Sequence, residues 1–128
     1  GISCDGGDGI VTSIVLPETN LLATLPTELA LLPNLATINL KRNVLWGTLP
    51  TEFTSMSSLV TVNLQDNHIK GKVPAFRSKL LQQLDISHNG LTGHVVPDFG
   101  ADNEALVYLD LQKNQLSGYL PYGLEDLP

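Results

Sequence analysis

Apolar and polar residues alternate along most of this chain in a pattern that repeats at a fixed interval. The clearest copy runs from Leu35 to Phe53, reads LATINLKRNVLWGTLPTEF, and follows the skeleton L-x-x-I-x-L-x-x-N-x-L-x-G-x-L-P. Further copies begin at Leu59, Leu81 and Leu106, and a degenerate copy begins at Val11. Prolines close these copies at positions 26, 50, 74, 97 and 121, so the period is 24, 24, 23 and 24 residues. A regular period of this length predicts a solenoid of stacked units.

The start of each copy alternates apolar and polar residues over a few positions, which is typical of a short, half-buried strand. One full coil separates each strand from the next, so we expect the strands to stack in parallel, about 4.8 Å apart. The predicted strand cores are Ser13–Val15, Thr37–Asn39, Thr61–Asn63, Gln83–Asp85 and Tyr108–Asp110.

The asparagine, glycine and proline of the skeleton have structural interpretations. An inward asparagine at a sharp turn both donates to and accepts from backbone groups that the turn leaves unpaired. Glycine and proline suit the bends that follow. We therefore predict a structural ladder of four asparagines, Asn43, Asn67, Asn89 and Asn114.

The segments between each proline and the next strand carry apolar residues at spacings that suit a single helical or 3₁₀ turn. The third of these segments, AFRSK, is two residues shorter than its equivalents, so the chain must tighten there. Phe53, Met56, Phe76 and Phe99 are interpreted as core residues of these turns.

The L-x-G-x-[LV]-P sequence after each strand resembles the plant-type subclass of leucine-rich repeats, known from receptor kinase ectodomains and polygalacturonase-inhibitor-like proteins. The segment LPTEFTSMSSLVTVNLQDN also resembles surface-antigen repeats of trypanosomatid protozoa. The resemblance implies an α/β solenoid: a leucine-rich-repeat horseshoe segment with a parallel concave β-sheet, short 3₁₀, helical or irregular convex turns, and about five repeats of about 24 residues. It also implies a second short strand near Trp46 and Gly47 and their equivalents.

The resemblance covers residues 11–128, which we interpret as the solenoid, while residues 1–10 are rich in Gly and Asp and are expected to form a loop or the remnant of an N-terminal cap. Cys4 lies in GISCDG, which resembles the end of a disulfide-stapled cap whose other cysteine is upstream; a small buried thiol is the alternative. A sixth unit begins after Pro121, so we expect the solenoid to be a truncated part of a longer array.

The net charge of −6 and the pI of about 4.7 argue against a nucleic-acid partner, because phosphate binding needs a basic face. The longest apolar runs are only a few residues, so these residues are not expected to insert into a membrane. The family resemblance implies an extracellular or cell-surface recognition module that is not an enzyme, with a protein, peptide or glycan partner. The absence of an N-x-S/T sequence gives secretion no support, and an intracellular scaffold is the less favoured alternative.

Two columns of polar residues are expected on the concave face. The first has nearly alternating charges, and either stabilises the stack through weak ion pairs or forms a recognition ridge. It contains Glu18, Arg42, Asp66, His88 and Lys113. The second includes Asp85 and Asp110, which we expect on adjacent strands with their side chains in solvent, so that neither is needed for folding.

The sequence predicts no catalytic site, metal or cofactor. A carboxylate pair needs burial or a cleft to shift its pKa, which a solenoid face does not provide. His68, His88 and His94 fall at three different coil positions and do not converge as metal ligands would. Ser87, His88 and Asp85 lie on one strand without a nucleophile turn.

Two functional hypotheses stay open. In the first, a concave patch with Tyr108 as its aromatic anchor binds a ligand. That patch contains Gln83, Asp85, His88, Tyr108, Asp110 and Lys113. In the second, the chain is a structural or assembly repeat that packs against other chains through an exposed flank carrying Leu22 and Trp46, within a larger assembly.

Overall fold

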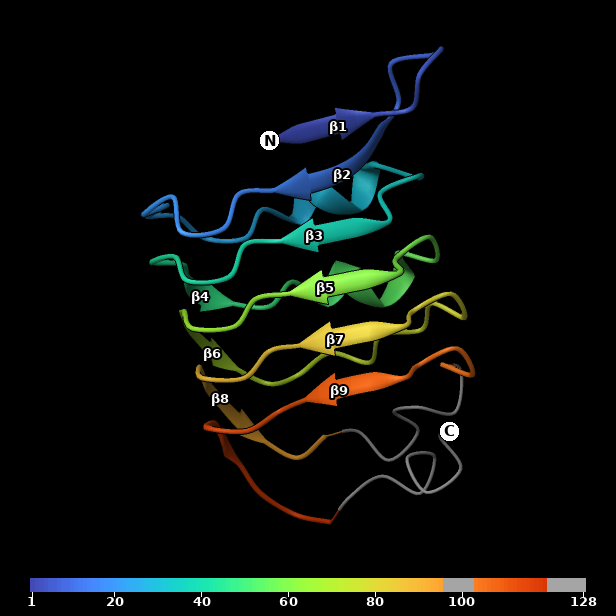
Figure 1. Cartoon of the computed structure of the whole chain (residues 1–128). Helices are drawn as coiled ribbons and strands as arrows, with labels where there is room; N and C mark the ends of the chain where they lie inside the picture. Colours follow the sequence, from blue (N-terminus) through green and yellow to red (C-terminus); the bar gives the residue numbers. More distant parts are fainter. Residues whose placement is uncertain (96–102, 120–128) are drawn as a thin grey trace.

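The computed structural model describes residues 1–95 and 103–119, which form a solenoid with two narrow sheets (Figure 1). The larger sheet has six strands in the order β1-β2-β3-β5-β7-β9. Its strands are β1 (Ile2–Cys4), β2 (Val11–Val15), β3 (Thr37–Asn39), β5 (Thr61–Asn63), β7 (Gln83–Asp85) and β9 (Tyr108–Asp110). From β2 to β9 every pairing is parallel, and equivalent residues of successive units lie opposite each other, as the repeat pattern predicts.

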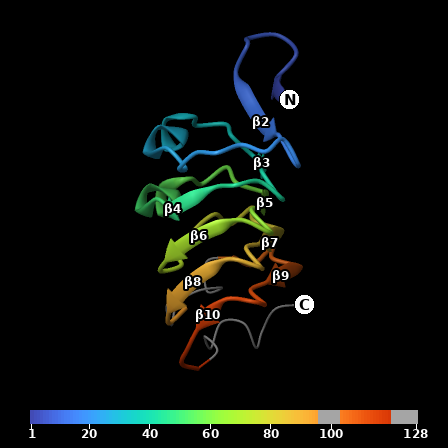
Figure 2. The same cartoon turned by 90° about the vertical axis from the view of Figure 1, so that its left-hand side faces the viewer.

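A second sheet lies along one flank of the solenoid, in the order β10-β8-β6-β4 (Figure 2). Its strands are β4 (Trp46–Thr48), β6 (His68–Gly71), β8 (Gly90–Gly93) and β10 (Gln115–Leu116). The second strand expected near Trp46 and Gly47 is therefore confirmed. Its register differs from that of the concave sheet, because Trp46 lies opposite His68 and Thr48 opposite Lys70, two residues short of their repeat equivalents.

The convex side carries two 3₁₀ helices, η1 (Thr27–Leu31) and η2 (Thr51–Ser55), each beginning directly after a repeat proline. Both confirm the short helical turns expected there. The shortened segment at residues 75–79 has no helical turn, but Phe76 still enters the core and meets Phe53, with ring centroids 6.2 Å apart and planes tilted by 59°. An aromatic side chain thus fills the space where the backbone is shorter.

The core consists of the inward residues of the repeat, stacked from unit to unit. Ile38, Val62 and Leu84 are fully buried and lie opposite one another on adjacent strands. Leu35, Leu59 and Leu81 form an equivalent buried row. Because each row buries its side chains only against its neighbours, the core extends along the stack and has no single centre.

Of the two alternatives for residues 1–10, a loop or the remnant of a cap, a loop alone does not describe the N-terminal segment. Ile2–Cys4 form a strand that pairs antiparallel with β2, while the turn predicted by composition is confined to residues 6–8. The glycines and aspartates concentrate in residues 5–9. The composition of residues 1–10 taken together therefore does not indicate that three of these residues can form a strand with β2. Cys4 is a free and exposed thiol, and the interpretation of a buried thiol is therefore wrong.

Candidate functional site

The concave strands end in a repeated turn built by their own polar side chains. The side-chain oxygen Oδ1 of Asn39, Asn63, Asp85 and Asp110 accepts a hydrogen bond from the backbone N–H two residues later, at 3.0 to 3.3 Å. This is an Asx turn, in which a short polar side chain satisfies a donor that the end of the strand leaves unpaired. The column that the sequence suggested as a polar surface therefore has a structural task in the four units from β3 to β9.

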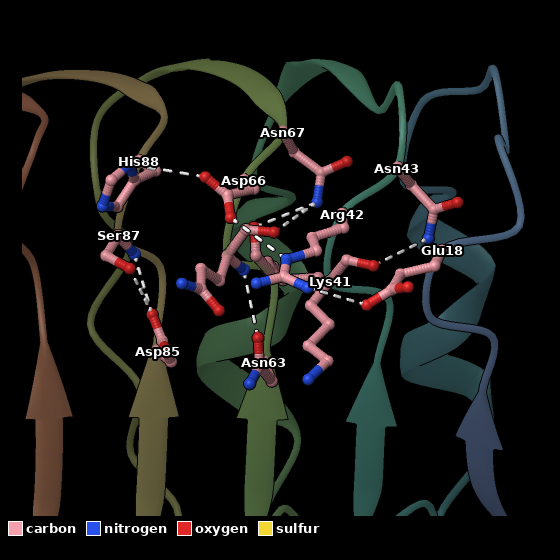
Figure 3. Close-up of polar contacts among 12 residues, drawn as sticks. Glu18, Lys41, Arg42, Asn43, Asn63, Asp66, Asn67, Asp85, Ser87 and His88 are labelled. Carbon is pink, nitrogen blue, oxygen red and sulfur yellow. Dashed lines mark hydrogen bonds and ion pairs between the residues drawn. The ribbon is translucent and has the colours of Figure 1, made fainter.

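Asp85 is the clearest correction to the sequence analysis. Its residue is only 8% exposed, and Oδ1 also accepts a hydrogen bond of 2.7 Å from the hydroxyl of the fully buried Ser87 (Figure 3). The expectation that Asp85 points freely into solvent is wrong, because a buried donor pair holds the carboxylate at the end of β7. Asp110 occupies the same register position on β9 and is half-buried.

The charged and polar residues expected after the first four strands of the repeat, from Glu18 to His88, contact one another in sequence (Figure 3). Arg42 lies 3.0 Å from Glu18 and 3.6 Å from Asp66, and His88 Nδ1 lies 3.3 Å from the other oxygen of Asp66. These groups are between 38% and 57% exposed, so each pair contributes no more than about 1 kcal/mol. Lys113, the last residue of the column, has no ion-pair partner among residues 1–95 and 103–119.

The backbone at this charged column is left-handed in every unit, which sequence reasoning did not anticipate. Glu18, Arg42, Asp66, His88 and Lys113 have φ between 52° and 55°. Residues other than glycine seldom adopt this backbone conformation. The surrounding turn therefore has to offset its energetic cost. No glycine occupies this position in any unit. In the sequence, the left-handed residue is therefore marked only by its position between the strand and the ladder asparagine.

Behind the charged column, each ladder asparagine joins its own unit to the preceding one. In Asn67, Nδ2 donates to the carbonyls of Leu40 and Leu64 at 3.1 and 3.0 Å, while Oδ1 accepts from Leu45 N at 3.0 Å. The same three-way arrangement recurs at Asn43, Asn89 and Asn114. These side chains are occupied by backbone groups, so none of them is free for a ligand.

Tyr108 is an exposed aromatic residue of the concave sheet, with 48% of its surface accessible. It lies opposite Gln83 on the neighbouring strand, and its hydroxyl donates to Asp110 Oδ2 at 3.4 Å. The charge of Asp85 is the largest cause that raises the pKa of the phenol above 10.0, followed by partial desolvation and then by the charge and hydrogen bond of Asp110. The ring, an amide and two carboxylates therefore meet on strands β7 and β9.

The structure brings only part of the predicted patch together as an accessible surface. Gln83, Tyr108, His88 and Lys113 are exposed, whereas Asp85 contributes its charge from a buried position. Within the described residues, no group of three or more His, Cys, Asp or Glu side chains could hold a metal ion. None of the helices described there is long and apolar enough to cross a membrane.

Comparison with known proteins places this geometry in a family. A family model described as Leucine Rich Repeat matches residues 80–101 and 105–127. The crystal structure of the BIR3–SERK2 complex from Arabidopsis thaliana is similar over 97% of this chain and 68% of that chain, with 31% identity and a TM-score of 0.87. The chain belongs to the plant-type leucine-rich-repeat family.

Other similar structures include a receptor kinase ectodomain and a peptide hormone receptor. The ectodomain of the receptor kinase SOBIR1 from Arabidopsis thaliana matches over 100% of this chain and 72% of that chain, with 25% identity and a TM-score of 0.84. The plant peptide hormone receptor RGFR1 in complex with RGF2 matches over 88% of this chain, with 31% identity and a TM-score of 0.83, but this chain covers only 18% of it. No curated protein sequence matches the chain.

The flank of this leucine-rich-repeat solenoid carries the two exposed apolar residues that the sequence singled out. Leu22 is 72% exposed and Trp46 is 54% exposed. The shifted register places Trp46 opposite Thr24 and His68 instead of opposite Leu22. The two apolar side chains therefore do not occupy directly opposite positions on the flank.

Proposed function

We propose that this chain is an extracellular recognition segment, without catalytic activity of its own, that binds a peptide or protein partner on the concave face around Tyr108. The observation that carries the proposal is the exposed Tyr108 ring between Gln83 and Asp110, at the end of the sheet where the charged column is no longer internally paired. Exposed tyrosine supplies a large, rigid contact area at little entropic cost and is a frequent anchor of interfaces.

The chemistry of the patch suits a peptide. Gln83 offers a donor and an acceptor to a peptide backbone, Lys113 offers an unpaired cation, and Asp110 retains a half-exposed carboxylate. Towards the other end of the column, Glu18, Arg42 and Asp66 are already engaged with one another, so a ligand would have to displace their pairs. Binding energy is therefore expected to concentrate on β7 and β9.

Similarity to the peptide hormone receptor RGFR1, and to the receptor kinase HAESA in complex with a peptide hormone, supports the proposed partner class. The chain covers only 18% of each of these two proteins, so the support concerns the kind of surface and not a particular hormone. Similarity to the ectodomain of the receptor kinase SOBIR1 supports the extracellular location. No residue of the patch is inferred from those structures.

A displayed library of random peptides tests the proposal directly. Peptides selected on the wild-type chain are remeasured by biolayer interferometry on Tyr108→Ala and on Trp46→Ala, the matched control on the flank. Tyr108→Ala is expected to weaken binding about tenfold, as loss of a buried aromatic anchor does, while Trp46→Ala leaves it unchanged. Selected peptides that all tolerate Tyr108→Ala would contradict the proposal.

An assembly role is the second candidate, and it rests on the exposure of Leu22 and Trp46. In that case the order of the two variants reverses: sedimentation velocity would show self-association of the wild-type chain, weakened by Trp46→Ala and untouched by Tyr108→Ala. An indole buried against a second chain removes more apolar area from water than any other exposed side chain of the flank.

A further inference from the structure

The fourth unit of the repeat places next to each other two structural residues that no other unit combines. The ladder asparagine Asn89 is followed directly by Gly90, whereas the ladder asparagines of the other units are followed by Val44, His68 and Gln115. Asn89–Gly90 is the only Asn-Gly pair in the sequence. Because glycine has no side chain beside its backbone nitrogen, that nitrogen can attack the side-chain carbonyl carbon of the asparagine before it.

The fold explains each residue of this pair for a separate reason. Asn89 connects the units of β5 and β7, because its Nδ2 donates to the carbonyls of Leu64 and Ile86 at 2.9 and 3.3 Å. Gly90 begins β8, and a methyl group added there would lie 3.3 Å from the backbone carbonyl oxygen of Ile69. A side chain at position 90 therefore crowds the backbone of β6. The reactive pair is thus a consequence of packing in this unit.

Hydrogen bonds hold the side-chain amide of Asn89 in place. Besides the two bonds to the carbonyls of adjacent units, Nδ2 donates to the Ser87 carbonyl at 3.0 Å, and Oδ1 accepts from Ile69 N at 3.0 Å. Rotation of the amide plane breaks these bonds. Asn89 is half-buried, whereas Asn43 and Asn67 are buried, so water has readier access to this amide.

We propose that Asn89–Gly90 is a deamidation site and acts as a one-way switch: local opening of the turn frees the amide to react, and the product cannot restore the hydrogen bonds. The Gly90 nitrogen loses its proton and bonds to Cγ of Asn89, while the side-chain nitrogen leaves as ammonia and a succinimide ring forms. Water then opens the ring. Attack at Cγ gives aspartate, and attack at the backbone carbonyl carbon gives isoaspartate, whose main chain runs through Cγ.

Either product removes the donor that connects the two units. A carboxylate at position 89 presents oxygens to the carbonyls of Leu64, Ile86 and Ser87, which then have no donor and repel the negative charge. Isoaspartate also lengthens the main chain by one carbon atom at the start of β8. Since each unit of a solenoid is stabilised by its neighbours, deamidation loosens the junction between the units of β5 and β7.

The rate of deamidation tests whether the fold controls the reaction. The intact chain is incubated at 37 °C and pH 8, and peptide mass spectrometry follows Asn89 together with the control residues Asn67 and Asn114. A synthetic peptide of residues 85–93 measures the rate without the fold, and its Gly90→Ala variant should react more slowly. Asn89 of the folded chain should convert at least about tenfold more slowly than the peptide, because only the locally opened fraction reacts. Asn67 and Asn114 should stay intact.

The stability of the product tests whether the reaction is a switch. Asn89→Asp reproduces one product and should lower the urea midpoint of unfolding. The matched control is Asn34→Asp, which makes the same change at an exposed residue outside the ladder and should leave the midpoint unchanged. Equal midpoints for the two variants would overturn the proposal. So would equal rates in chain and peptide, or no detectable conversion of the folded chain within about 30 half-lives of the peptide.

Discussion

At the scale of single residues, the concave face places a structural carboxylate next to the aromatic ring of the proposed recognition site. Asp85 closes an Asx turn and holds the Ser87 hydroxyl, yet its charge still reaches the Tyr108 phenol on the next strand. Tyr108 is exposed and opposite Gln83. The carboxylate is therefore part of the turn, while the ring above it is the accessible group.

The first prediction tests whether Asp85 stabilises the fold through its oxygen Oδ1 as a hydrogen-bond acceptor or through its negative charge. Asp85→Ala leaves the N–H and hydroxyl of the buried Ser87 without their acceptor and should lower the free energy of unfolding by about 1–3 kcal/mol. Asp85→Asn keeps Oδ1 and should be nearly neutral, because Asn39 and Asn63 close the same turn in other units. Urea denaturation of the two variants provides the measurement. Equal stability of Asp85→Ala and the wild-type chain would contradict the turn assignment.

The second prediction concerns the ionisation of Tyr108. In a background with Tyr119→Phe and Tyr122→Phe, phenolate absorbance should titrate above pH 10.0. Asp85→Asn should lower this midpoint, since the charge of Asp85 is the largest cause of the raised pKa, and Asp110→Asn should also lower it, since Asp110 adds both a charge and a hydrogen bond. The folded state keeps the phenol proton to higher pH than the unfolded chain. This stabilising effect is therefore fully present below about pH 10 and is lost as the pH rises through the folded-state pKa. A midpoint at or below 10.0 would contradict the arrangement.

At the scale of the elements, the turn after each concave strand does most to connect one unit to the next. The ladder asparagine satisfies carbonyls of two successive units with one amide. The next residues enter the flank sheet, whose strands pair two residues out of repeat register. Many backbone N–H groups of the turn donate to the next unit, as Arg42 N does to the Gln65 carbonyl. The carbonyls of Leu40 and Leu64 are instead satisfied by the side chain of Asn67.

The third prediction compares two asparagines of the same unit. Asn67 is 6% exposed and bonds to Leu45 N and to the carbonyls of Leu40 and Leu64, so Asn67→Ala should lower the free energy of unfolding by about 2–4 kcal/mol. Asn63 is half-buried and accepts a single backbone N–H, from Gln65, so Asn63→Ala should cost about 0.5–1.5 kcal/mol. Thermal and urea unfolding of both variants measure the difference. Equal decreases in the free energy of unfolding would contradict a larger contribution of the ladder asparagine to stability.

At the scale of the whole molecule, the solenoid presents three different surfaces on one backbone. The concave sheet carries paired charges and the Tyr108 patch, the convex side carries short 3₁₀ turns, and the flank carries the exposed Leu22 and Trp46 (Figures 1 and 2). Tyr108 lies on the concave sheet and Trp46 on the flank sheet, so substitutions at these two positions change different surfaces. This separation is what allows the concave and flank proposals to be tested independently.

The sequence alone determined the repeat, the concave strands, the ladder asparagines and the alternating column, because each depends on residue type at a fixed spacing. Burial of Ile38 and exposure of Trp46 follow from that spacing. The flank strand was expected from the resemblance to plant-type leucine-rich repeats. Only the tertiary structure decided the shifted register of the flank, the left-handed backbone at Arg42 and the burial of Asp85. The flank register depends on how the neighbouring unit is placed. Asp85 closes a turn because Ser87, two residues later, gives its carboxylate two donors, and residue type at a strand end does not by itself decide between such a turn and exposure to water.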